Sequence, residues 1–122
     1  MSTPDVILTE AMAAHQAGRL QQAAGQYEQV LQQQPDNPDA LHFYGLLHFQ
    51  LGRGIEAVKL IGRSLDLAPG NPHAWNNLGN ILVHLSRLDD ALDAYDRCAW
   101  WDPTYAGAPY GKSDVLRRLG RA

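Results

Sequence analysis

Apolar residues recur along the chain at helical spacing and form pairs of stripes. In residues 38–69, the first stripe comprises Leu41, Tyr44, Leu47 and Leu51, and the second comprises Ile55, Val58, Ile61, Leu65 and Leu67. This spacing places the apolar side chains on one face of an α-helix. Gly52 separates the stripes, because glycine readily adopts the positive φ that ends a helix, and Pro69 cannot continue the second helix. The segment therefore predicts two helices joined by a tight turn.

The same pattern returns every 34 residues, as Pro35, Pro69 and Pro103, as Ala23, Ala57 and Ala91, and as Arg19, Arg53, Arg87 and Arg121. The pair Asn37-Pro38 recurs as Asn71-Pro72 and suits a helix start, because asparagine caps a helix and proline fits its first position. The turn glycine recurs as Gly18, Gly52 and Gly120, with Ser86 in the remaining place. A fixed period of this length predicts a stacked array of helical hairpins.

The period divides one domain, 1–122, into repeats at 4–37, 38–71 and 72–105 and a half repeat at 106–122. Two helices in each repeat and one in the half repeat give seven. In the third repeat they should run from about residue 73 to 85 and from about 88 to 101. The half repeat is either a capping helix or the start of a further repeat in a longer protein.

Small residues stand where paired helices should approach closely. Gly45 and Gly79 fall inside the first helix of a pair, and Ala57 and Ala91 fall near the start of the second. Glycine inside a helix costs about 1 kcal/mol relative to alanine, so its presence indicates close packing. Cys98 takes the place that Ser64 has in the preceding repeat, and we expect it to be buried.

The third repeat reads Trp75-x-x-Leu78-Gly79-x-x-Leu82, then Ala91-x-x-x-Tyr95, then Pro103. This resembles the tetratricopeptide repeat, whose pattern is W-x2-L-G-x2-Y, A-x3-F, P. The second repeat matches less fully, with His48 and Ile61 in the aromatic places. The resemblance implies an all-α, right-handed superhelical array of antiparallel helix hairpins with a concave groove.

Composition argues against several classes of protein. The net charge is −3 and no basic stripe is visible, which disfavours nucleic-acid binding. No apolar run approaches the roughly 20 residues needed to span a bilayer, and no secretory signal is apparent. A lone cysteine, Cys98, cannot form an internal disulfide. These features fit a cytoplasmic protein without a membrane partner.

No catalytic, cofactor-binding or metal-binding pattern is visible in the sequence. The glycines follow the repeat and not a phosphate-binding loop. The histidines include no i, i+4 pair that would give two metal ligands on one helix. Four aspartates share one helix, Asp89, Asp90, Asp93 and Asp96, where they suit a solvated helix start better than an acid–base pair. We therefore expect a protein that is not an enzyme and needs no cofactor.

The family resemblance implies that the first helix of each pair lines the groove. The resulting candidates for peptide binding are His42, Phe43, Leu46, Phe49, His73, Asn76, Asn77, Asn80, His84, Tyr110, Asp114 and Arg117. The same helix faces also carry Leu8, Thr9, Met12 and His15 in the first repeat, Asp39 and Gln50 in the second, Val83 in the third and Arg118 in the last helix. Asparagine can both donate to and accept from a peptide backbone. The alternative is that the asparagines are solvated and bind nothing.

Asn77 and Asn80 resemble one rung of the asparagine ladder of O-linked N-acetylglucosamine transferases. Phe43 and Leu46 occupy the equivalent places one repeat earlier, so the ladder is not continuous. These residues also depart from the lysine-and-asparagine clamp with which other family members hold a C-terminal carboxylate. The groove should therefore be apolar in its middle and polar towards the C-terminal end.

Two tryptophans interrupt the repeat pattern. Trp100 replaces Asp66 and should face solvent, whereas Trp101 replaces Leu67 and should lie in the core. An exposed tryptophan can anchor an interface, which suggests a homo-oligomer through Trp100. The alternative is local repacking around Ala99.

The sequence thus predicts a non-catalytic module that binds a protein or peptide in its groove. Two other functions stay open. The chain is alternatively the N-terminal, substrate-recruiting module of a larger enzyme, such as a bacterial glycosyltransferase, or a self-assembling scaffold.

Overall fold

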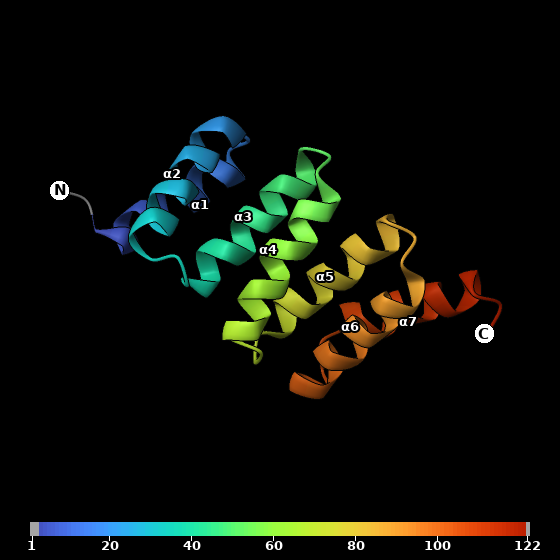
Figure 1. Ribbon diagram of the computed structural model, residues 1–122. Coiled ribbons are helices and arrows are strands. Elements are labelled where there is room, and N and C mark those ends of the chain that lie inside the picture. Colours follow the sequence, from blue (N-terminus) through green and yellow to red (C-terminus); the bar gives the residue numbers. More distant parts are fainter. Residues whose placement is uncertain (1–2, 122) are drawn as a thin grey trace. The chain divides into compact units, whose positions relative to one another are not determined.

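A computed structural model describes residues 3–121, which form seven α-helices and no strand (Figure 1). The helices are α1 (Pro4–Gln16), α2 (Leu20–Gln33), α3 (Pro38–Gln50), α4 (Gly54–Leu67), α5 (Pro72–His84), α6 (Leu88–Trp101) and α7 (Gly107–Arg118). The all-α class is confirmed, and the bounds expected in the third repeat agree with α5 and α6 to within one residue. Met1, Ser2 and Ala122 belong to the expected domain but lie outside the described residues.

The helices fall into two compact units, unit 1 ending at Leu67 and unit 2 beginning at Ala68. In unit 1, α1 pairs with α2 and α3 pairs with α4, and α3 also packs against α2 and α1. In unit 2, α5 pairs with α6, and α7 packs against both of them (Figure 1). The repeat ranges within a single domain stay a prediction.

Three helix starts carry a side-chain cap, and the sequence predicts two of them, Asn37 and Asn71. The side-chain oxygens of Asn37 and Asn71 accept hydrogen bonds from the backbone N–H groups of Ala40 at 3.0 Å and Ala74 at 3.2 Å. Thr3 caps α1 in the same way. A proline stands at the beginning of each of these helices, α1, α3 and α5. Each cap satisfies a backbone donor that the helix itself leaves open.

The turns within the repeats share one geometry, which explains two periodic residues. Gly18 and Gly52 have φ of +80° and Gly120 has +71°, while Ser86 adopts +60° in the same place. The arginine after each turn donates its backbone N–H to the carbonyl five residues earlier, at 2.8–2.9 Å in all four turns. This bond closes the helix end, and it requires the left-handed residue before it.

Glycines admit large side chains between helices, as the sequence predicts. A Cβ on Gly45 would lie 2.7 Å from Cγ1 of Ile61, and a Cβ on Gly79 would lie 2.6 Å from Cε1 of Tyr95. A Cβ on Gly111 of α7 would also approach the Tyr95 ring, to 2.5 Å. Tyr95 is therefore held between two helices that lack side chains where they touch it. In unit 1, a buried cluster comprises Ala11, Ala14, Ala23, Tyr27 and Leu47.

Replacing Ser86 by glycine is expected to stabilise the protein. A left-handed residue other than glycine costs about 1–2 kcal/mol, and the greater freedom of glycine in the unfolded chain offsets part of the gain. We expect the free energy of unfolding in denaturant to rise by about 0.5–1 kcal/mol. Gly52→Ala is the matched control and should lower it. Destabilisation by Ser86→Gly would show that the serine is not strained.

Acid is expected to weaken the packing around His48. Burial, and then the guanidinium of Arg53, lower the pKa of His48, and the carboxylates of Glu56 and Glu28 offset this only in part. The His48 Nδ1 is buried without a hydrogen-bond partner, and the ring packs edge-on against Tyr44, with centroids 4.5 Å apart. Between the lowered pKa and about 6.5 the unfolded chain binds more protons than the folded one.

The free energy of unfolding should therefore fall as the pH drops below about 6.5, and it should level off below the pKa of the folded state. His48→Phe keeps the aromatic contact and removes the titration. Denaturant unfolding at a series of pH values should show the parent losing more stability than the variant between neutral and mildly acidic pH. Parallel pH profiles for the two proteins would contradict the assignment.

Candidate functional site

A hollow of about 300 Å³ opens on unit 1 and is lined by Met12, His15, Gln16, Tyr27, Phe43, Leu46 and Gln50. Three of these residues come from α1, three from α3, and Tyr27 from α2. None of the seven carries a formal charge when histidine is neutral. The hollow therefore combines an apolar wall of methionine, phenylalanine and leucine with a rim of amides and one imidazole.

Helical register explains why these side chains meet. Phe43, Leu46 and Gln50 are spaced by three and four residues, and Met12 and Gln16 by four, so each set lies on one face of its helix. Leu47 and the alanines of α1 bury the adjoining face of each helix in the core. The core thus fixes the orientation of the residues that line the hollow.

His15 joins the three helices of the hollow through two hydrogen bonds. Its Nδ1 lies 2.9 Å from the Tyr27 hydroxyl, and its Nε2 lies 2.6 Å from Oε1 of Gln50. Burial raises the pKa of Tyr27 to about 12, so the phenol stays protonated near neutral pH. The hydroxyl can then donate to Nδ1, and Nε2–H donates to Gln50. This arrangement leaves the amide nitrogen of Gln50 as a donor that a ligand can use.

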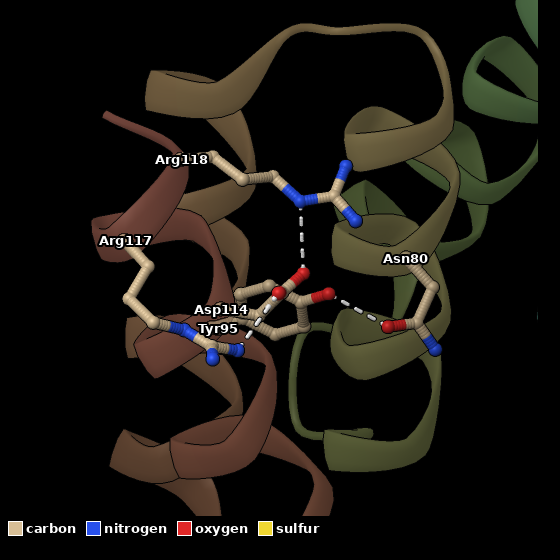
Figure 2. A network of polar contacts seen from close by, with 5 residues as sticks. All are labelled: Asn80, Tyr95, Asp114, Arg117 and Arg118. Carbon is tan, nitrogen blue, oxygen red and sulfur yellow. Dashed lines mark hydrogen bonds and ion pairs between the residues drawn. The ribbon is translucent and has the colours of Figure 1, made fainter. Parts of the chain in front are cut away.

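Unit 2 presents a second polar surface on α5 and α7. The Tyr95 hydroxyl donates to Oδ1 of Asn80 at 2.7 Å, and Figure 2 shows this bond beside an ion-pair group on α7. In that group Asp114 accepts from Arg117 at 3.1 Å and from Arg118 at 3.0 Å. Burial, and then the negative charge of Asp114, raise the pKa of Tyr95, so the phenol stays a donor. The amide nitrogen of Asn80 remains for other partners.

The start of α5 carries a further polar group. Nδ1 of His73 lies 2.7 Å from the Tyr105 hydroxyl, and Oδ1 of Asn76 is buried without a hydrogen-bond partner. A Cβ on Gly107 would lie 3.0 Å from that oxygen. Oδ1 of Asn76 thus faces the start of α7, while the residue as a whole is half-buried.

The predicted groove residues fall into distinct environments. Phe43 and Leu46 line the hollow of unit 1, and Asn80, Asp114 and Arg117 form the surface on unit 2. Phe49 and Asn77 are half-buried, whereas His84 and Tyr110 are exposed. His42 requires a correction. Its side chain is only 2% exposed and stacks on Phe43, so it supports the wall and does not face a ligand.

Tyr27 and Gln16 are residues of the hollow that the sequence reasoning missed. Tyr27 stands at an apolar position of the repeat, which predicts a core residue, and its ring is indeed fully buried. The Tyr27 hydroxyl is the feature of the sequence that could have indicated a polar role, because a buried tyrosine normally finds a hydrogen-bond partner. The histidine that provides this partner lies 12 residues earlier, on the other helix of the hairpin.

The two tryptophans differ from each other as sites. Trp100 is 78% exposed, which confirms that it faces solvent. The expectation that Trp101 lies in the core is wrong, because Trp101 is 47% exposed, with its ring beside Gly70. Leu67, its equivalent one repeat earlier, is equally exposed. This position lies at the end of the second helix, beyond the buried stripe. Cys98 is buried, as expected.

Within residues 3–121 no helix combines the length and apolar character required to cross a bilayer. In the same range, histidine, cysteine, aspartate and glutamate nowhere gather in groups of three or more that would hold a metal ion.

Two tetratricopeptide repeat family models match the chain, one over residues 14–76, which is more than half of it, and one over residues 55–109. The chain belongs to the tetratricopeptide repeat family. Repeats of this family generally mediate protein–protein interaction. The hairpins, the turn glycines and the close helix contacts described above are the local basis of the match.

Solved structures share the fold. A mutant O-GlcNAc transferase of Thermobaculum terrenum is 30% identical with a TM-score of 0.87, over 95% of this chain and 23% of that one. The first tetratricopeptide domain of Spaghetti (RPAP3), bound to an HSP90 peptide, is 18% identical with a TM-score of 0.91, over 96% and 93% of the two chains.

Among curated proteins, the Arabidopsis thaliana CTR9 homolog is 34% identical over 87 residues, which is 70% of this chain and 8% of that protein. The BBSome member bbs-4 of Caenorhabditis elegans is 32% identical over 73 residues, which is 60% of this chain and 16% of that protein. The chain therefore spans only a small part of these relatives.

Removing the Tyr27 hydroxyl is expected to destabilise unit 1. Tyr27→Phe leaves Nδ1 of His15 without its donor, and a lost hydrogen bond of this kind costs about 0.5–1.5 kcal/mol. Denaturant unfolding of the parent, Tyr27→Phe, His15→Leu and the double variant forms a mutant cycle. We expect the two substitutions to be less costly together than their sum. Additive effects would show that the bond contributes nothing.

Proposed function

We propose that this tetratricopeptide module is not itself catalytic and binds a peptide or partner helix, with the hollow of unit 1 as the pocket for an apolar side chain. The observation that carries the proposal is the hollow itself. Its volume of about 300 Å³ is at the lower end of the range for ligand pockets, and an apolar wall with a few placed polar groups is their usual composition.

The chemistry of the lining favours a neutral anchor residue. Met12, Phe43 and Leu46 offer apolar contact, and the absence of a charged group in the lining disfavours a carboxylate anchor. The amide nitrogen of Gln50 can donate to a peptide carbonyl, because its oxygen is already engaged by His15. One side chain in the hollow and one backbone contact at its rim would fix the direction of a bound segment.

The surface of unit 2 supplies polar contacts of a different kind. Asn80 is held by Tyr95 through its oxygen, so its amide nitrogen can bond a peptide carbonyl. Asp114 fixes Arg117 and Arg118, which stay more than half exposed and offer donors to an acidic side chain. We propose this surface of unit 2 as a separate polar contact site for a protein ligand.

One of the similar structures supports a role in protein interaction. The RPAP3 domain was solved with an HSP90 peptide, and the fold likeness to this chain is high. The residues of this chain nonetheless differ from a lysine-and-asparagine clamp, since Phe43 and Leu46 stand in its place. We therefore propose that the ligand is a protein held by an apolar anchor residue. We also propose that the module works in the cytoplasm.

A second function is favoured by one observation. The chain is 30% identical to the O-GlcNAc transferase over 95% of its own length, which is 23% of that enzyme. The module would then recruit substrates for a catalytic part elsewhere in the same polypeptide. The intact mass of the protein in its source cell separates the two functions. A mass near 13.5 kDa supports the stand-alone module, and a much larger mass supports the enzyme.

Selection from a displayed peptide library should yield ligands with one apolar anchor residue. Leu46→Asp places a carboxylate in the wall of the hollow and should weaken binding of a selected peptide by at least about 30-fold, because a buried charge must be desolvated. Leu51→Asp is the matched control, since Leu51 is 42% exposed outside the hollow, and it should change the Kd little. Calorimetry measures both.

Asn77→Ala combined with Asn80→Ala tests the polar surface of unit 2 with a peptide selected from the library. Each buried hydrogen bond that is lost should cost about 0.5–1.5 kcal/mol of binding free energy. Full affinity in this double variant would show that these two asparagines do not contribute to peptide binding. Equal affinity of the parent and Leu46→Asp would show that the hollow does not bind the peptide.

A further inference from the structure

The outer face of α6 carries a hollow that the peptide site does not use. It has a volume of about 480 Å³ and is lined by Asp93, Asp96, Arg97 and Trp100. Trp100 projects from the same face and is 78% exposed. Tryptophan is enriched among the residues that anchor interfaces.

The polar groups of this face are only partly used within the chain. Asp93 makes no ion pair or hydrogen bond with any residue in 3–121, and neither does the indole N–H of Trp100. Asp96 pairs with Lys112 at 2.7 Å. The guanidinium of Arg97 lies over the Trp75 ring, 5.5 Å from the ring centroid. The N–H groups at the edge of a guanidinium stacked in this way can still donate hydrogen bonds.

The order of these residues along α6 is self-complementary. Asp93 and Trp100 lie equally far, on opposite sides, from the midpoint between Asp96 and Arg97. A two-fold axis through that midpoint would bring α6 of a second copy alongside in the antiparallel direction. Each Trp100 would then face Asp93 of the other copy, and each Arg97 would face Asp96 of the other copy.

We infer that this face of α6 binds a second copy of the chain through such a two-fold contact, an interaction separate from the proposed peptide site. In this contact each Trp100 enters the other copy's hollow, and its indole N–H donates to the unpaired carboxylate of Asp93. The two carboxylates of Asp96 meet the two guanidiniums of Arg97. Trp100, the hollow and the charged pair Asp96 and Arg97 lie on one surface. An isologous interface requires this, because the same patch must serve both copies.

The size of the surface sets the strength of this association. A contact built on one face of one helix buries less than a standard interface, so the dimer should be weak, with a Kd of the order of 100 µM. A basic segment of another protein is the competing occupant, because the lining carries two carboxylates and one guanidinium. Self-complementarity favours the second copy, since it satisfies Arg97 as well.

Sedimentation velocity over a concentration series tests the contact. The parent should shift from monomer to dimer, and Trp100→Ala should raise the Kd by at least about 10-fold. Trp101→Ala is the matched control and should leave the Kd unchanged. Circular dichroism establishes that each variant is folded.

Two charge variants provide the sharper test. Asp96→Arg alone sets arginine against arginine across the axis, and Arg97→Glu alone sets glutamate against aspartate, so each variant by itself should be monomeric. An equimolar mixture of the two restores both ion pairs and should dimerise with about the Kd of the parent. A monomeric parent, dimerisation of Trp100→Ala at parental strength, or a mixture that stays monomeric would each overturn the inference.

Discussion

The packing of one side chain from the second helix of a hairpin against the first helix governs the rest of this structure. Tyr27, Ile61 and Tyr95 occupy this position in successive repeats and are all buried. Gly45 and Gly79 face two of them, at distances that leave no room for a Cβ. Two of the three are tyrosines whose hydroxyls extend beyond the core to His15 and Asn80. The residue that closes the hairpin therefore also orients a polar group on the candidate binding surface.

The fold is predictable from the sequence where the cause is local. Caps at Asn37 and Asn71, positive φ at the turn glycines and the close contacts at Gly45 and Gly79 each follow from a residue type and its place in the period. Trp101 shows where this reasoning stops. Its place in the period is apolar, but the buried stripe ends before it, and only three-dimensional packing shows how far the core extends.

The candidate site is predictable only in part, for a related reason. Helical register assigns Phe43 and Leu46 to the exposed face of α3 without knowledge of any neighbour. The burial of His42 and the bond between His15 and Gln50 depend on contacts between distant parts of the chain, the latter 35 residues apart. Periodicity alone marks Tyr27 as core and does not reveal that its hydroxyl supports the hollow.

The two faces of α6 explain how a repeat can acquire a second surface without losing its fold. Ala91, Tyr95 and Cys98 form the buried face and are constrained by the helices that pack on them. Asp93 and Trp100 lie on the outer face, where the packing of the hairpin imposes no requirement on size or charge. Substitutions on this face therefore change the chemistry of the outer surface while the buried stripe keeps the hairpin closed. In a repeat protein, departures from the period on an outer face, such as tryptophan in the place of Asp66, are for this reason the residues most informative about association.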